Sequence, residues 1–429
     1  MAKKIAGSGF HKCSRWKLGN REQGRERFDT AKTLNYNSPN NFGEVSVVME
    51  LGRGREARRT YGFEEVAIAP GAVTVDPEEV DISTSIGPVK LPLPVLSSAM
   101  DAVSDPSFVI ALGRLGGLGV LHLEGLQTRY EKPQEAIAEI VVAEPSAVVK
   151  VIQRLYAEPI KEELIGRRIK EIREGGVPAA VAVSPGSARR FAEIIGPGQV
   201  EVFIVQITVT TARHISSRYE PPCFNTLKEK LQAPVLAGNC VGYQAALELM
   251  QAGADGVLVG VGPGAACTTR RALGLGVPQV TAIVDVAAAR EAFERQEGRR
   301  PVVIADGGMR RGGEVCKAIA AGADAVMLGT PLAAAKEAPG QGCHWGMSTS
   351  NPVLPRGTRI HVGTSGTLRE ILLGPTSRDD GSMNLTGALR LAMGSCGARN
   401  LREMQKAELV IAPAFEGEGK AIQRTQGVG

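Results

Sequence analysis

A glycine-rich loop that ends in a cysteine is the segment of this chain best suited to do chemistry. The string Gly260-Val-Gly-Pro-Gly-Ala-Ala-Cys267-Thr-Thr269 follows an apolar, strand-like run over 256–260. Its glycines allow tight turns that aim backbone amides and carbonyls inward, where they can hold an anion or an ion. A partly exposed cysteine in such a polar loop can act as a nucleophile. We therefore predict covalent catalysis by Cys267, with Thr269 either a second catalytic residue or a helix N-cap.

The composition indicates a soluble globular α/β protein. Of 429 residues, 43% are hydrophobic and only 4% aromatic, and there are 52 glycines. No run of eighteen apolar residues occurs, so no membrane span is expected. The seven cysteines lack C-x-x-C spacing. This disfavours a zinc site and a disulfide framework, and it predicts a reducing, cytoplasmic location.

The excess of positive charge lies at the start of the chain. Residues 1–48 hold nine Lys or Arg against four acidic residues, so the rest of the chain is balanced at 41 against 41. A balanced body gives no electrostatic case for binding nucleic acid. Residues 1–48 are polar and aperiodic and are predicted to be a disordered basic extension. This extension is either a flexible arm or a stretch upstream of the true start at Met49, and 49–429 is predicted to be one catalytic domain with a C-terminal segment.

Strand-like and helical patterns alternate regularly from residue 91 onward. Helical periodicity follows most of the apolar runs, as over 281–296 and 310–321, and the stretch 133–175 adds further helices. Eight such units in about 250 residues predict a (β/α)8 barrel, with a doubly wound sheet as the alternative. The predicted strands are 92–98, 117–123, 179–184, 202–208, 234–239, 256–261, 301–305 and 325–328.

Polar outliers fall where these predicted strands end. In a barrel the carboxyl ends of the strands meet at one face, so we expect these side chains to form the active site. Glycine-rich ends after the seventh and eighth strands are suited to bind phosphate through backbone amides. The outlying segments are 97–101, 238–239, 260–269, 306–308 and 329–330.

Taken together, these segments resemble the IMP dehydrogenase/GMP reductase family, over about residues 52–413. The resemblance is greatest to its branch without CBS modules in cyanobacteria and actinobacteria, through the segments 52–62 and 156–160. The matching motifs are S-S-A-M-D (97–101), G-N (238–239), G-V-G-P-G-A-A-C-T-T-R (260–270), G-V-P-Q (276–279), I-A-D-G-G (304–308), M-L-G-T (327–330), G-M (346–347) and G-A-L-R-L-A-M-G-S-C-G-A (387–398).

The resemblance implies a TIM barrel in which Cys267 attacks C2 of a purine nucleoside 5′-monophosphate, IMP or GMP. Hydride then moves between C2 and NAD or NADPH, and Thr269 positions or relays a proton. Asp306 would hold the ribose hydroxyls, and glycines with Thr330 the phosphate. The implied substrate-binding residues are Ser98, Met100, Asn239, Gly264, Asp306, Gly307, Gly308, Gly329, Thr330, Gly346 and Met347.

The resemblance also implies a cofactor site, an ion and an assembly. Gln206, Gly260 and Gly262 would lie beside the nicotinamide cofactor. Backbone carbonyls of Gly262, Gly264 and Cys267 would hold potassium. The family forms homo-tetramers or octamers, and we expect the same here.

Departures from the family pattern bear on the direction of the reaction. The connection over 126–177 is too short for CBS modules, and 344–357 leaves no room for the flap whose Arg-Tyr pair activates water in the dehydrogenases. NADPH-dependent reduction of GMP to IMP is therefore the predicted activity, with NAD-dependent oxidation of IMP to XMP as the alternative.

Three further departures leave other readings open. Thr349 stands where reductases have a glutamate, Gln206 replaces an aspartate of the family, and Ala265 replaces a phosphate-binding serine. These changes keep a non-catalytic nucleotide-binding barrel as a second alternative. An FMN enzyme or a Schiff-base aldolase on the same fold is a third, although Leu258 stands where an aldolase would need a lysine.

Overall fold

The computed structural model describes residues 48–217, 219–346 and 358–412, which belong to two units divided between Arg59 and Thr60. In the first unit, β1 (Val48–Gly52) and β2 (Arg55–Arg58) form an antiparallel hairpin. The second unit holds the remaining elements. Residues 1–47 of the predicted extension lie outside the described part of the chain.

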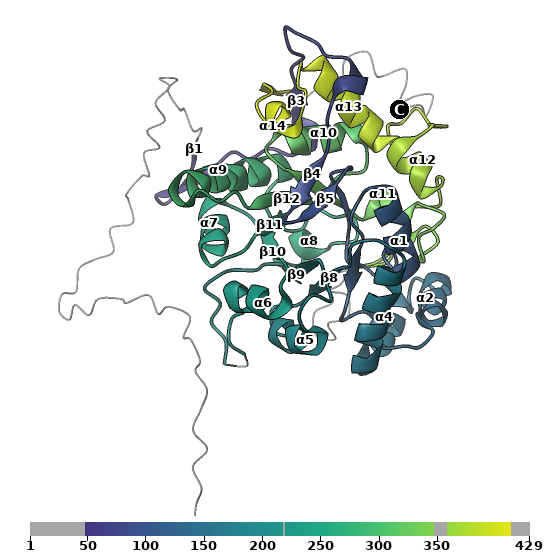
Figure 1. The fold of residues 1–429 in the computed structure, drawn as a ribbon. Coiled ribbons are helices and arrows are strands. Elements are labelled where there is room, and N and C mark those ends of the chain that lie inside the picture. Colours follow the sequence, from purple (N-terminus) through teal and green to yellow (C-terminus); the bar gives the residue numbers. More distant parts are fainter. Residues whose placement is uncertain (1–47, 218, 347–357, 413–429) are drawn as a thin grey trace, which may run out of the picture. The chain divides into compact units, whose positions relative to one another are not determined.

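Eight parallel strands form the centre of the second unit, in the order β6-β13-β12-β11-β10-β9-β8-β7. Each predicted strand overlaps one of them, with β10 and β12 each ending one residue beyond the predicted range, and Figure 1 shows helices arranged around them. Their bounds are β6 Val95–Ser97, β7 Val120–His122, β8 Ala180–Val183, β9 Val202–Gln206, β10 Val235–Cys240, β11 Gly256–Val259, β12 Val302–Asp306 and β13 Ala325–Leu328.

The sheet closes between its first and last strands. The Leu118 amide donates to the Val95 carbonyl at 2.9 Å, and the Ser97 amide donates to the Leu118 carbonyl at 3.1 Å. The Val120 amide then donates to the Ser97 hydroxyl at 2.9 Å, so a side chain continues the ladder. The predicted (β/α)8 barrel is therefore confirmed, and the doubly wound alternative is excluded.

Apolar side chains fill the barrel. Residues such as Leu96, Leu236 and Ile304 form one buried cluster inside the strands. The antiparallel hairpin of β4 (Thr84–Ile86) and β5 (Val89–Leu91) contributes Ile86 and Leu91 to that cluster. Because parallel strands are covered on both faces, they are mostly apolar along their length. They could therefore be predicted from continuous apolar runs in the sequence.

Helices cover the outside of the barrel. The two helices predicted over 281–296 and 310–321 are confirmed as α9 and α10, and α9 ends where Gly298 takes a left-handed conformation. The connection from β7 to β8 contains α2, α3 and α4. The helices are α1 Pro106–Arg114, α2 Pro133–Val142, α3 Val148–Ala157, α4 Glu162–Glu174, α5 Ala188–Ile195, α6 Phe224–Leu231, α7 Tyr243–Gln251, α8 Thr269–Leu273, α9 Gln279–Glu297, α10 Gly312–Ala320, α11 Thr330–Ala333, α12 Leu368–Leu373, α13 Leu385–Ser395 and α14 Leu401–Met404.

Short strands join distant parts of this unit. β16 (Leu409–Ile411) pairs antiparallel with β3 (Val66–Ile68), so the end of the described chain returns to its beginning. β14 (Cys343–His344) pairs with β15 (Ile360–His361) on either side of 347–357, which lies outside the described residues.

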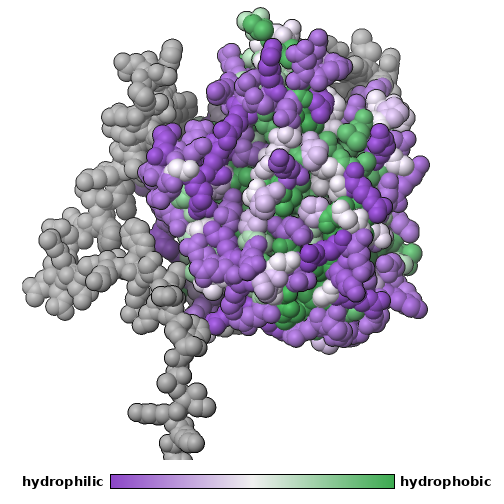
Figure 2. Space-filling view, in the orientation of Figure 1, coloured by the Kyte–Doolittle hydropathy of each residue, from purple (hydrophilic) through white to green (hydrophobic). Residues whose placement is uncertain are grey.

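The surface on view in Figure 2 is mostly hydrophilic, with apolar side chains in small groups between polar ones. Among the helices of the described residues, none is both long and apolar enough to cross a membrane.

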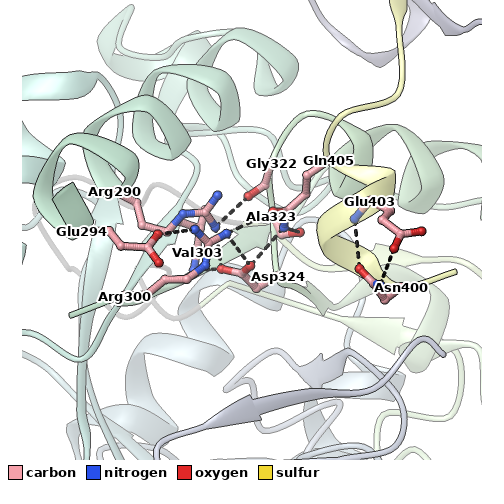
Figure 3. A network of polar contacts seen from close by, with 10 residues as sticks. All are labelled: Arg290, Glu294, Arg300, Val303, Gly322, Ala323, Asp324, Asn400, Glu403 and Gln405. Atoms are coloured by element: carbon pink, nitrogen blue, oxygen red, sulfur yellow. Dashed lines mark hydrogen bonds and ion pairs between the residues drawn. The ribbon is translucent and has the colours of Figure 1, made fainter. Parts of the chain in front are cut away.

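A buried ion pair connects α9 to the barrel and to α14 (Figure 3). The Arg290 guanidinium, 1% exposed, donates to Asp324 Oδ2 at 2.7 Å and to the Gly322 carbonyl at 3.1 Å. The same Asp324 oxygen accepts from the Val303 amide of β12 at 2.8 Å. Gln405, next to α14, donates to Asp324 Oδ1 at 3.0 Å. Asp324 thus joins three elements that are distant in the sequence.

Replacing Arg290 by Met should destabilise the protein by about 3 kcal/mol, because it leaves the Asp324 carboxylate buried without its main partner. The measurement is urea denaturation followed by circular dichroism. The matched control is Arg295→Met, which removes an exposed arginine of the same helix and should change stability by less than about 0.5 kcal/mol. Equal stability of the two variants would contradict this account of the pair.

Candidate active site

A cavity of about 600 Å³ opens at the carboxyl ends of the barrel strands. It is the size of a site for a nucleotide-sized ligand. Among its lining residues are fourteen that the sequence predicted: Ser98, Met100, Gln206, Asn239, Gly260, Gly262, Gly264, Cys267, Asp306, Gly307, Gly308, Gly329, Thr330 and Gly346.

Cys267 lies at the wall of this cavity, half-buried, after the glycine-rich loop. Its thiol lies 3.1 Å from the hydroxyl of Thr269, within hydrogen-bonding distance. Thr269 is fully buried as the first residue of α8, and Thr268 rather than Thr269 is the N-cap. A hydroxyl held at this distance can exchange a proton with the thiol or with a group bound to it.

The cysteine loop packs directly on the turn after β12. Gly307 has a φ of +81° and Gly308 a φ of +83°, a region that L side chains rarely adopt. A Cβ added at Gly307 would lie 3.3 Å from the Gly264 amide nitrogen, and one at Gly308 would lie 3.1 Å from Pro263 Cβ. Glycine at these positions lets the two loops approach closely and present their backbone to the cavity.

Asp306 ends β12 inside the cavity. Its Oδ2 accepts hydrogen bonds from Asn239 Nδ2 at 2.7 Å and from Gln206 Nε2 at 2.9 Å. Burial raises the pKa of the Asp306 carboxyl to about 6, and the two amide donors partly oppose this rise. Asp306 is therefore a carboxylate at neutral pH that can accept hydrogen bonds from a bound ligand.

The wall next to Asp306 is formed at the ends of β13 and β6, the neighbouring strands in the sheet, together with β14. A Cβ at Gly329 would lie 3.2 Å from the Ser98 hydroxyl oxygen and 3.5 Å from the Met100 sulfur, so these three residues meet. Thr330 Oγ1 lies 3.3 Å from His344 Nε2, whose ring is 2% exposed. Burial lowers the pKa of His344 to about 4, so the ring is neutral at physiological pH.

Two further predictions concern Met347 and the potassium site. Met347 lies outside the described residues. For the predicted potassium site, Gly262, Gly264 and Cys267 all line the cavity, and the Gly264 carbonyl already accepts the Cys267 amide at 3.0 Å. One lone pair of that carbonyl remains for an ion.

The sequence analysis missed a polar wall built by β7, β8 and the connection between them. His122, Glu124, Arg129, Tyr156 and Ser184 all line the cavity. Their only sequence signal was position, because His122 and Ser184 stand at or just after the ends of predicted strands. Arg129 and Tyr156 come from the connection itself. Tyr156 begins the segment 156–160 that resembles one branch of the family, but nothing in the local sequence predicts that either residue lines the cavity.

Glu124 is the carboxylate of this wall. Its Oε1 accepts the Ser184 hydroxyl at 3.0 Å and the Ser187 hydroxyl at 2.7 Å, and its Oε2 accepts the Ser184 amide at 2.5 Å. Arg129 donates to the Glu124 carbonyl and to that of Glu158. The Glu124 carboxyl group thus accepts three hydrogen bonds from the turn after β8, which fix it at the wall of the cavity.

Tyr156 connects three segments around the cavity. Its hydroxyl donates to Asp101 Oδ2 at 2.5 Å and accepts from the indole nitrogen of Trp345 at 2.9 Å. Asp101 Oδ1 accepts the Leu126 amide at 2.9 Å. Burial raises the pKa of Tyr156 well above its usual value, and the Asp101 carboxylate adds to the rise, so the phenol stays protonated.

Comparisons with known proteins agree with this geometry. Residues 60–351 match the model of the IMP dehydrogenase / GMP reductase domain. The chain is 40% identical to an uncharacterized oxidoreductase of Mycolicibacterium smegmatis, over 85% of this chain and 100% of the relative. It is 29% identical to an inosine-5′-monophosphate dehydrogenase of Methanocaldococcus jannaschii, over 83% of this chain and 93% of that enzyme. An IMP dehydrogenase/GMP reductase-like protein of Corynebacterium glutamicum has a similar structure, with a TM-score of 0.80 and 37% identity over 85% of this chain and 97% of the other.

Cys267 should react with iodoacetamide at least about tenfold faster than Cys240 and Cys316, because the thiolate is the reactive form. Burial raises the pKa of both other thiols to about 12. Peptide mapping by mass spectrometry at pH 8 measures the three rates in one sample. Labelling of Cys240 as fast as Cys267 would contradict the assignment of Cys267 as the accessible nucleophile.

Proposed function

Because the chain belongs to the IMP dehydrogenase/GMP reductase family, an oxidoreductase family, we propose that it oxidises IMP to XMP with a nicotinamide cofactor. The proposal rests on Cys267 for bond formation and on Glu124 for the direction of the reaction. Relatives named as IMP dehydrogenases, from Methanocaldococcus jannaschii and Aquifex aeolicus, support this direction.

Cys267 is the nucleophile of the proposed reaction. Its thiolate adds to C2 of the purine, and C2 loses a hydride. Water then adds to C2, the C2–sulfur bond breaks, and the sulfur leaves as a thiolate. Thr269 relays a proton to or from the Cys267 thiol, since its hydroxyl lies 3.1 Å from the sulfur. The ribose is assigned to Asp306 and the phosphate to Gly308, Gly329 and Thr330, whose positions around one cavity support that placement.

The observation that carries the oxidative direction is the Glu124 carboxylate in the cavity of Cys267. Oxidation needs a base that takes a proton from the attacking water. The Glu124 carboxyl group is fixed in this cavity by three hydrogen-bond donors, and the Arg129 guanidinium, which donates to the Glu124 backbone carbonyl, can orient a water molecule. The sequence prediction of GMP reduction relied on the lack of an Arg-Tyr pair in 344–357, and the present proposal takes Glu124 as the base in place of that pair.

Ser184, Ile207 and Thr208 line the same cavity as Cys267 and would hold the nicotinamide ring. Ile207 offers an apolar surface for the ring, and the hydroxyls of Ser184 and Thr208 offer partners for its carboxamide. When bound there, the nicotinamide accepts the hydride from C2. These residues therefore fit the cofactor that the family uses.

GMP reduction with NADPH is the second candidate. Its supporting observation is that 344–357 contains no Arg-Tyr pair. In that direction the Glu124 carboxyl would have to donate a proton to the departing ammonia. A nucleotide-binding barrel without turnover remains as the third outcome of the assay below.

Absorbance at 340 nm should rise when the purified protein is given IMP and NAD, and it should not fall with GMP and NADPH. Cys267→Ala should abolish the change, because no covalent bond to C2 can form. A fall with GMP and NADPH would establish the reductase instead. IMP binding without any absorbance change would identify a non-catalytic barrel.

Glu124→Gln should lower kcat about a hundredfold while IMP binding changes little, since the amide keeps the shape but cannot take a proton. Stopped-flow and steady-state kinetics measure the loss. The control is Glu135→Gln, the same change at an exposed position of α2. Unchanged kcat in Glu124→Gln would remove Glu124 from the mechanism.

A further inference from the structure

We propose that Gln206 is a positioning residue that holds the Asp306 carboxylate for the ribose diol of the nucleotide. The inference rests on the proposed function, because it assigns the ribose to Asp306. It differs from the sequence expectation, which placed Gln206 beside the nicotinamide cofactor. It makes the strand-end amides of β9 and β10 the determinants of selectivity for a nucleotide with intact ribose hydroxyls.

Three side chains form a closed triangle across the mouth of the barrel. Gln206 Nε2 lies 2.9 Å from Asn239 Oδ1 and 2.9 Å from Asp306 Oδ2. Asn239 Nδ2 completes the triangle at 2.7 Å from the same Asp306 oxygen. β9 and β12 are not neighbours in the sheet, so these contacts reach over the barrel interior.

The hydrogen bonds fix the orientation of the Gln206 amide. Both hydrogens of Nε2 are used, and turning the amide over would place its carbonyl oxygen against a carboxylate. The side chain is 8% exposed, and its Oε1 is buried without a partner among the described residues. A buried acceptor without a partner is unfavourable by about 1–3 kcal/mol. The orientation of the amide is therefore explained by the hydrogen bond that it donates to Asp306, and not by the hydrogen-bonding needs of Gln206 itself.

The triangle leaves one carboxylate oxygen available. Both amides bind Oδ2, and no hydrogen bond of the described residues involves Asp306 Oδ1. With Oδ2 anchored, the carboxylate cannot rotate freely, and Oδ1 is presented to the cavity that it lines. A pair of neighbouring hydroxyls is the ligand group that suits such an anchored acceptor, because each hydroxyl can donate one hydrogen bond.

The groups around Asp306 are neutral amides. Gln206 comes from β9 and Asn239 from β10, while Gln279 of α9 donates to the Asp306 backbone carbonyl at 3.3 Å. The described residues show no ion pair for Asp306. The other titratable groups of the cavity are Cys267, His122, Glu124, Arg129, Tyr156 and His344. A carboxylate at position 206, as the family pattern has, would place a like charge against Asp306 and favour its protonated form.

The test measures IMP and 2′,3′-dideoxy-IMP binding by isothermal titration calorimetry without cofactor, from pH 5 to pH 8.5. The ratio of the two dissociation constants isolates the diol, because the phosphate titrates identically in both ligands. In the unaltered protein the diol should strengthen binding at least tenfold at pH 8, and the ratio should fall as pH drops through about 6, where Asp306 gains a proton.

Two variants examine Gln206. Gln206→Leu should reduce the ratio at pH 8 at least fivefold, because it removes the donor that anchors Oδ2. Gln206→Glu should move the fall of the ratio upward by at least one pH unit, which a general loosening of the site would not do. The control is Gln251→Glu, the same change at an exposed position of α7, and it should leave the profile unchanged.

The outcomes separate this inference from the proposed function. Absence of IMP binding to the unaltered protein would overturn both. Normal IMP binding with an unchanged ratio in Gln206→Leu and an unchanged pH profile in Gln206→Glu would overturn the role of Gln206 alone. If Gln206→Leu does not fold, as judged by circular dichroism, the pH profile of Gln206→Glu decides.

Discussion

Closure of the parallel sheet between β6 and β7 is the constraint on which the site depends. Among the described residues, four hydrogen bonds join the segments of this edge, one of them through the Ser97 side chain. Once the ring is closed, the carboxyl ends of all eight strands meet at one mouth. Residues separated by more than two hundred positions, such as Ser98 and Asp306, then line the same cavity. The core supports this ring with apolar side chains packed on both faces of every strand.

Burial at the mouth determines how the polar groups behave. Asp306 and His344 both lose solvation there, which raises the pKa of the carboxyl and lowers that of the imidazole. The amides of Gln206 and Asn239 oppose the effect on Asp306 and keep it charged at neutral pH. The cavity therefore combines the neutral imidazole of His344, the charged carboxylate of Asp306 and the thiol of Cys267. For Asp306 and His344 the local environment determines the charge at neutral pH.

The connection between β7 and β8 forms part of the wall of the cavity. Arg168 of α4 is almost fully buried and donates to the carbonyls of Gln127 and Glu131, so the connection is fixed against the helix layer. Arg129 and Tyr156 are thereby held at the cavity. A segment too short for CBS modules thus becomes part of the site, beside Glu124.

The sequence by itself determined the barrel and one half of the site. Eight buried strands are largely apolar runs, and the glycine-rich turns after β11 and β12 can be recognised because Gly260, Gly262, Gly307 and Gly308 adopt a positive φ that favours glycine. Cys267, Asp306 and Gly329 were therefore predictable. Tertiary structure alone decided the other half: Arg129 and Tyr156 lie in the connection between β7 and β8, and no local pattern predicts that they line the cavity. It also decided the partner of Gln206, because a hydrogen bond between residues 100 positions apart depends on how the barrel closes.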